Sequence, residues 1–103
     1  MNQLQTQIAK VRTDIGARFP TPTLVAHLSF ITQELGELHD AALRNGLVEP
    51  QAYLRSRPKD LSVAEELGDL LSMTLSLCNV LNLDADQLIN QTLAKWIARA
   101  EES

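Results

Sequence analysis

Apolar residues recur at the three- and four-residue spacing of an amphipathic helix along most of the chain. A short first helix is predicted from Leu4, Ile8, Val11 and Ile15. The Phe-Pro-Thr-Pro segment at 19–22 ends it, because proline cannot continue a helix. We expect Thr21 to cap the second helix, with Pro22 at its first position. Its apolar seam comprises Leu24, Leu28, Ile31, Leu35, Leu38 and Ala42.

The second helix should stop at Asn45-Gly46, a typical helix end. Residues 45–60 lack a helical period and are predicted to form a long loop. Either Asp60 or Ser62 begins the third helix, which is apolar on nearly all sides over residues 70–81. One short chain offers few helices to cover such a surface, so this pattern favours an oligomer.

A last helix is predicted from Asp84 to about Ala100, because Asp84 and Gln87 form a capping-box pattern. No stretch alternates in the way that a strand requires. The expected fold is therefore all-α: a four-helix bundle with an antiparallel central hairpin, completed by oligomerisation.

Composition limits the possible functions of this fold. A chain of 103 residues predicts a single domain, 1–103. A net charge of −4 argues against a nucleic-acid partner, which selects a basic surface. The apolar stretch 70–81 is shorter than the roughly 20 residues that span a bilayer, and the chain starts without a signal-peptide pattern. We therefore expect a cytoplasmic protein without membrane contact.

Two similar hexapeptides carry the candidate chemistry: Gln-Glu-Leu-Gly-Glu-Leu at 33–38 and Glu-Glu-Leu-Gly-Asp-Leu at 65–70. Each places two acids three residues apart, Glu34 with Glu37 and Glu66 with Asp69, so that both acids of a pair share a helix face. Each also has a mid-helix glycine, which costs about 1 kcal/mol relative to alanine. A glycine in the same setting twice suggests that another group approaches the helix backbone closely.

Helical angles place each acid pair on a flank of the same hand beside its apolar seam, which on the third helix runs through Val63, Leu67, Leu71 and Thr74. In an antiparallel hairpin these flanks meet, so the four carboxylates would share one groove. Four like charges repel unless neutralised, and Mg²⁺ or Mn²⁺ prefers such oxygen ligands. Acid pairs also occur on ordinary solvated faces, which is the competing interpretation. His27 and Phe30 lie on the second helix before Glu34.

With Glu34, Glu37, Glu66 and Asp69 in this pattern, the chain resembles the MazG-like nucleotide pyrophosphohydrolases of the all-α NTP pyrophosphatase superfamily, over residues 22–100. The resemblance implies Mg²⁺-dependent hydrolysis of a nucleoside triphosphate, of the house-cleaning type, to monophosphate and pyrophosphate. It also implies a homodimer or a tetramer built as a dimer of dimers.

We expect roles for further residues, of which the resemblance itself implies only those of Lys95 and Arg99. Glu37 and Glu34 would act in catalysis, with a non-ligating oxygen of Glu37 accepting the proton from water. Basic residues that meet phosphates would be Lys95 and Arg99 on the last helix, with Arg55, Arg57 and Lys59 in the loop. The base would lie near His27, Phe30 and Trp96.

One departure keeps an alternative open. Many members have two adjacent acids at the first motif, whereas this chain has Gln33 before Glu34. A non-catalytic helical module that binds nucleotide or a partner is the competing function, and phosphoribosyl-ATP is a competing substrate. The preferred base and sugar cannot be read from these residues.

Overall fold

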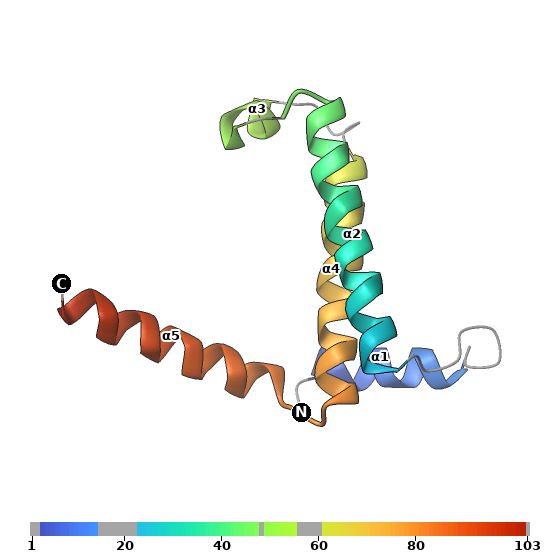
Figure 1. Ribbon diagram of the computed structural model, residues 1–103, viewed down its shortest axis with the longest axis vertical. Helices are drawn as coiled ribbons and strands as arrows, with labels where there is room; N and C mark the ends of the chain where they lie inside the picture. Colours follow the sequence, from blue (N-terminus) through green and yellow to red (C-terminus); the bar gives the residue numbers. More distant parts are fainter. Residues whose placement is uncertain (1–2, 15–22, 48, 56–60, 103) are drawn as a thin grey trace. The chain divides into compact units, whose positions relative to one another are not determined.

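The computed structural model describes residues 3–14, 23–47, 49–55 and 61–102, which form five helices (Figure 1). These are α1 (Gln3–Asp14), α2 (Leu24–Arg44), α3 (Pro50–Arg55), α4 (Leu61–Val80) and α5 (Ala85–Glu102). The described residues include no strand, so the prediction of an all-α fold is confirmed. The chain divides into two compact units, Pro22–Thr74 and the remainder.

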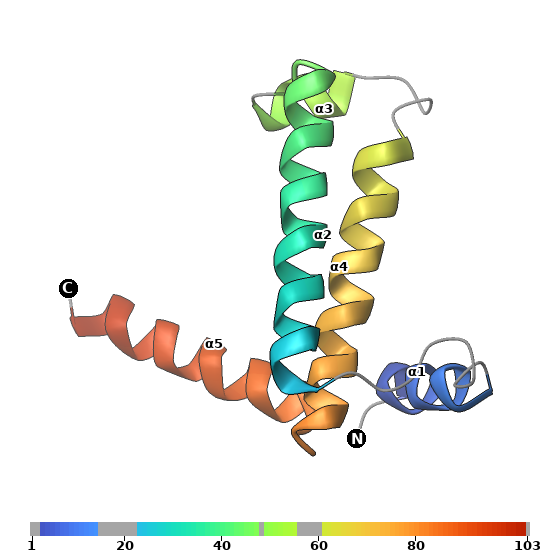
Figure 2. The ribbon, with the colours of Figure 1, turned by 45° about the vertical axis from the view of Figure 1, so that its right-hand side comes forward.

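The Pro22–Thr74 unit is a helical hairpin. Helices α2 and α4 lie side by side and antiparallel in both ribbon views (Figures 1 and 2). Their contact face includes the following side chains that are at least half-buried: His27, Ile31, Glu34, Leu38 and Ala41 on α2, and Val63, Glu66, Leu70 and Met73 on α4. Both sets follow the alternating four- and three-residue steps of a helix–helix seam.

This seam is rotated from the one that the sequence predicts. Of the predicted apolar stripe on α2, Leu28 and Leu35 are 45% and 54% exposed, and on α4 Leu71 is 58% exposed. Glu34 and Glu66 were expected beside the seam, but they lie within it. The prediction assumed that the most apolar stripe faces the neighbouring helix of the same chain. Instead, much of that stripe remains uncovered.

Helix α2 begins at Leu24, two residues later than predicted. Its N-cap is Thr23, whose hydroxyl accepts a hydrogen bond of 3.1 Å from the Ala26 backbone N–H. Such a bond satisfies one of the backbone donors that every helix start leaves unpaired. The predicted cap at Thr21 with Pro22 was therefore wrong, although a threonine does perform this function.

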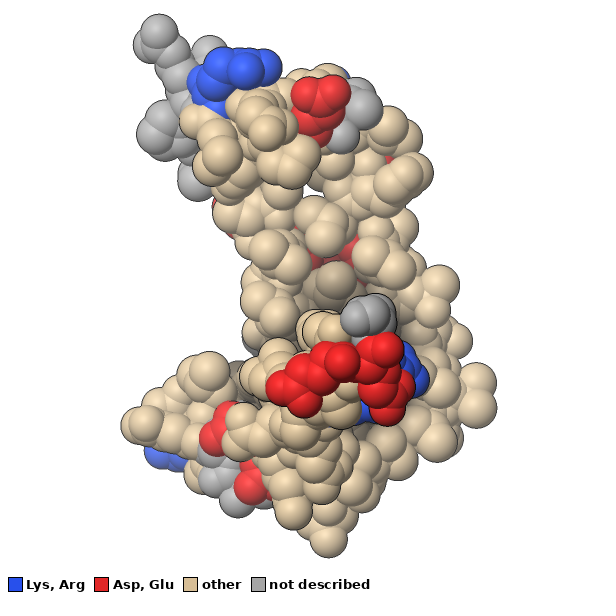
Figure 3. All heavy atoms as spheres, turned by 90° about the vertical axis from the view of Figure 1, so that its left-hand side faces the viewer, with Lys and Arg blue, Asp and Glu red and all other residues tan. Residues whose placement is uncertain are grey.

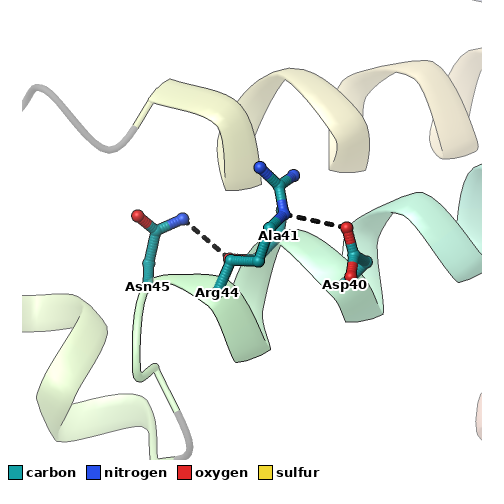
Figure 4. Close-up of polar contacts among 4 residues, drawn as sticks. All are labelled: Asp40, Ala41, Arg44 and Asn45. Atoms are coloured by element: carbon teal, nitrogen blue, oxygen red, sulfur yellow. Dashed lines mark hydrogen bonds and ion pairs between the residues drawn. The ribbon is translucent and has the colours of Figure 1, made fainter.

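The predicted stop of α2 at Asn45-Gly46 is confirmed. Gly46 takes φ +66°, Leu47 N–H donates to Ala42 O at 2.8 Å, and Gly46 N–H donates to Leu43 O at 3.1 Å. This pair of bonds is a Schellman motif, which needs a left-handed residue after the cap. Figure 4 shows two polar contacts near the end of α2: the Asn45 side chain donates to Ala41 O, and Arg44 forms an ion pair of 2.8 Å with Asp40. Each contact joins two residues that are one helical turn apart.

The predicted loop between the acidic helices contains a short helix, α3, that the sequence analysis missed. Pro50 is its first residue, a position where the missing N–H costs nothing. Six residues are too few to show a helical period. Helix α4 includes Leu61, so the predicted start at Ser62 is wrong, whereas the other predicted start, Asp60, lies outside the described residues.

The second unit joins α1 to the turn between α4 and α5 through one buried side chain. Gln5 is fully buried; its amide Nε2 donates to Leu83 O at 2.8 Å and its Oε1 accepts from the Ala85 N–H at 2.8 Å. Asn79 completes the contact by donating to the Gln5 backbone carbonyl at 3.0 Å. These bonds connect residues more than 70 positions apart in the sequence, and no hydrophobic pattern predicts them.

Helix α4 ends in the same way as α2, with a residue of positive φ after the last turn, but this residue is an asparagine and not a glycine. Asn82 adopts φ +55°, and Leu83 N–H donates to Cys78 O at 2.8 Å. The carboxylate of Asp84 then caps α5 by accepting from the Asp86 N–H at 3.0 Å. Within the described residues, no helix is both long and apolar enough to cross a membrane.

Candidate metal centre

Three glutamates converge inside the hairpin. Glu34 and Glu37 come from α2 and Glu66 from α4, and each offers a carboxylate oxygen within 4.8 Å of the other two. The antiparallel pairing places the middle of α2 opposite the start of α4, which is why residues about 30 positions apart in the sequence meet. Glu34 and Glu66 are half-buried, whereas Glu37 is exposed.

Burial and mutual repulsion disfavour the ionised forms of this cluster. The pKa of Glu66 is raised to about 7, first by burial and then by its hydrogen bond with Glu37 and the charge there. The pKa of Glu34 is raised as well, by burial, by the charge of Glu37 and by that of Asp69. Without a cation, Glu66 is therefore only partly ionised near pH 7.

Two oxygens of the cluster lack a hydrogen-bond partner. Glu34 Oε2 and Glu66 Oε2 are buried, and neither has a donor within the described part of the chain. Buried acceptors without donors cost free energy, so such atoms indicate a missing positive partner. Carboxylate oxygens suit hard divalent cations such as Mg²⁺, and this group of ligands fits one.

The fourth predicted ligand, Asp69, lies one turn after Glu66 and is exposed. Its oxygens are not among those that lie within 4.8 Å of one another, but its charge raises the pKa of Glu34. Asp69 therefore lies at the edge of the cluster. The two glycines of the hexapeptides, Gly36 and Gly68, have no neighbour within 4 Å of an added Cβ, so no described residue outside their own helix turns approaches them closely.

The predicted substrate contacts are spread over several elements. His27 is fully buried in the hairpin, while Phe30 is 49% exposed on α2. Arg55 is exposed at the end of α3. Lys95, Trp96 and Arg99 are exposed on α5, in the other unit. Arg57 and Lys59 lie outside the described residues.

The structure also brings Gln33 into contact with the cluster. Its amide Nε2 donates to Glu37 Oε1 at 3.2 Å. A glutamine four residues before an acid on a helix is the signal that predicts such a contact.

The fold is a helical hairpin, and its clustered acids could hold a hard cation. These two features define a class of metal-dependent protein in which the cation would act on an anionic substrate. The family model of the MazG nucleotide pyrophosphohydrolase domain matches residues 23–103. The chain therefore belongs to this family, whose general activity is nucleotide pyrophosphohydrolysis. A search of curated proteins and a search of solved structures each returned no match.

Proposed function

We propose that this protein hydrolyses a nucleoside triphosphate, of the (d)NTP house-cleaning type, to the monophosphate and pyrophosphate, with Mg²⁺ or Mn²⁺ as cofactor. The observation that carries the proposal is the cluster of three glutamates with two buried, unpaired oxygens, in a chain of a pyrophosphohydrolase family. Such a cluster can be fully ionised only if something positive neutralises it.

Glu34, Glu66 and Asp69 would hold the cation together with Glu37. The cation would supply charge neutralisation for the triphosphate and a lower pKa for the attacking water. Glu37 is the most exposed of the three clustered acids, so we assign to it the acceptance of the water proton. The water oxygen forms a bond to the α-phosphorus as the bridging α–β P–O bond breaks, and pyrophosphate leaves.

The remaining predicted residues would bind the substrate. Basic side chains that offset phosphate charge would be Arg55, Arg57, Lys59, Lys95 and Arg99. Phe30 and Trp96 are exposed aromatic side chains suited to stacking against a base. His27 is buried, so we expect it to shape the hairpin beside the base rather than to touch phosphate.

We also propose that residues 1–103 form a single functional domain that works as a homodimer or a tetramer. The apolar stripe that α2 turns away from α4 supports this, because Leu28 and Leu35 are about half exposed. In the described part of the chain, the buried apolar side chains are only two alanines, Ala41 and Ala85. Figure 3 shows that uncharged side chains cover most of the face that it presents. A second copy would cover this stripe.

Product analysis tests the activity. We expect chromatography of a (d)NTP panel with Mg²⁺ to give monophosphate and pyrophosphate, and Glu37→Gln to abolish turnover. Glu65→Gln is the control, because Glu65 is an exposed acid that adjoins Glu66 on α4. Orthophosphate as the first product would overturn the proposed cleavage. Metal-dependent nucleotide binding without turnover would support the alternative function, a non-catalytic module. Gln33 favours this alternative because it replaces an acid that many members of the family have.

A further inference from the structure

We propose that Gln33 is a positioning residue: its amide holds the Glu37 carboxylate in the cluster and thereby strengthens cation binding. The inference rests on the proposed metal-dependent function and concerns this chain's own first motif. The contact itself is direct. Gln33 Nε2 donates to Glu37 Oε1 at 3.2 Å, and the helix brings both side chains to one face because they are four residues apart.

Glu37 needs such a restraint more than its neighbours do. Glu34 and Glu66 are half-buried between the two helices, so packing limits their rotamers. Glu37 is exposed, and an exposed glutamate loses considerable rotamer freedom when a cation fixes it. A side chain that is already restrained loses less freedom on binding, and the affinity rises accordingly.

The chemistry of the amide suits this position. A carboxylate at position 33 would add a negative charge one turn from Glu37, where like charges repel. A lysine would form an ion pair with Glu37 and so compete with the cation. The amide of Gln33 donates a hydrogen bond without any charge, so it can hold the Glu37 carboxylate without neutralising it.

The variant Gln33→Met tests the inference, because methionine keeps the length of the side chain and removes the donor. We expect the Mn²⁺ affinity, measured by calorimetry on the metal-free protein, to fall by about tenfold, the effect typical of losing a partner that orients a ligand. The control is Gln7→Met, which removes an exposed helical glutamine from α1 and should leave Mn²⁺ affinity unchanged. An unchanged affinity in Gln33→Met overturns the inference.

A double-mutant cycle separates action through Glu37 from any other effect. Glu37→Asp shortens the carboxylate and takes it out of reach of the Gln33 amide, so Gln33→Met should then have almost no further effect on Mn²⁺ affinity. Persistence of the full loss in the Glu37→Asp background would show that Gln33 acts by another route, and would overturn the inference.

The failure of this inference is distinguishable from the failure of the proposed function. If Glu37→Gln binds Mn²⁺ as tightly as the native protein, the metal site itself is wrong, and the inference falls with it. If Glu37→Gln loses Mn²⁺ while Gln33→Met retains native affinity, the site stands and only the role of Gln33 is refuted.

Discussion

Cation binding should displace a proton from Glu66, and the raised pKa of this residue sets the size of the effect. The pKa of Glu66 is about 7, because the carboxyl is partly buried and hydrogen-bonded to Glu37. A cation that uses this carboxylate must remove its proton first. At pH 6 about nine-tenths of Glu66 is protonated, so each cation should release about 0.9 proton, against about 0.1 at pH 8.

The apparent affinity follows from the same arithmetic. Since only about a tenth of Glu66 is ionised at pH 6, the apparent Kd for Mn²⁺ should be about tenfold weaker there than at pH 8. The raised pKa of Glu34 acts in the same direction. Glu66→Gln should bind Mn²⁺ more weakly at both pH values and lose this component of proton release.

Calorimetry in two buffers of different ionisation enthalpy counts the released protons directly. Glu65→Gln serves as the control, because it removes an exposed acid that adjoins Glu66, and it should preserve the native pH dependence. A native protein that binds Mn²⁺ with no proton release at pH 6 would refute the reasoning, since it would mean that Glu66 is either ionised already or not a ligand.

The other predictions concern stability and assembly. The folded pKa of Glu66 lies above its ordinary value of 4.5, so its stabilising contribution is complete below about pH 4.5 and is lost as the pH rises through about 7. In urea denaturation, metal-free Glu66→Gln should therefore be more stable than the native protein at pH 8 and not at pH 4.5; the reverse order would contradict the assigned shift. Gln5→Met should lower the free energy of unfolding by about 2–3 kcal/mol, because it leaves the buried Ala85 N–H unpaired; a loss below about 0.5 kcal/mol would count against this bond. Light scattering should give a multiple of 11.4 kDa for the native chain and a smaller multiple for Leu28→Asp, whereas a native monomer would remove the argument for assembly.

The sequence predicted the features that depend on local chemistry. The helical period identified α1, α2, α4 and α5, and the Asn45-Gly46 pair identified the end of α2 because glycine accepts a positive φ there. The spacing of the acids identified the two helix faces from which Glu34, Glu37 and Glu66 come. Each of these inferences uses information within a few residues of the position concerned.

Features that depend on a neighbour could not be read in this way. The rotation of the hairpin seam was missed because periodicity shows which stripe is apolar, and does not show what covers it. Glu34 and Glu66 count as polar in such a pattern, yet both lie in the contact between α2 and α4. The Gln5 contacts were missed because an amide has no periodic signature and its partners are distant in sequence.

The position of two glutamates in the seam between α2 and α4 sets a limit on how this hairpin can evolve. At those two positions a leucine would pack against the facing helix without burying a carboxyl group, so a substitution that stabilises the seam would also remove a candidate ligand. The stability of this hairpin and the proposed metal site therefore compete for the same two positions, and variants with stabilised seams should be inspected first for lost metal binding.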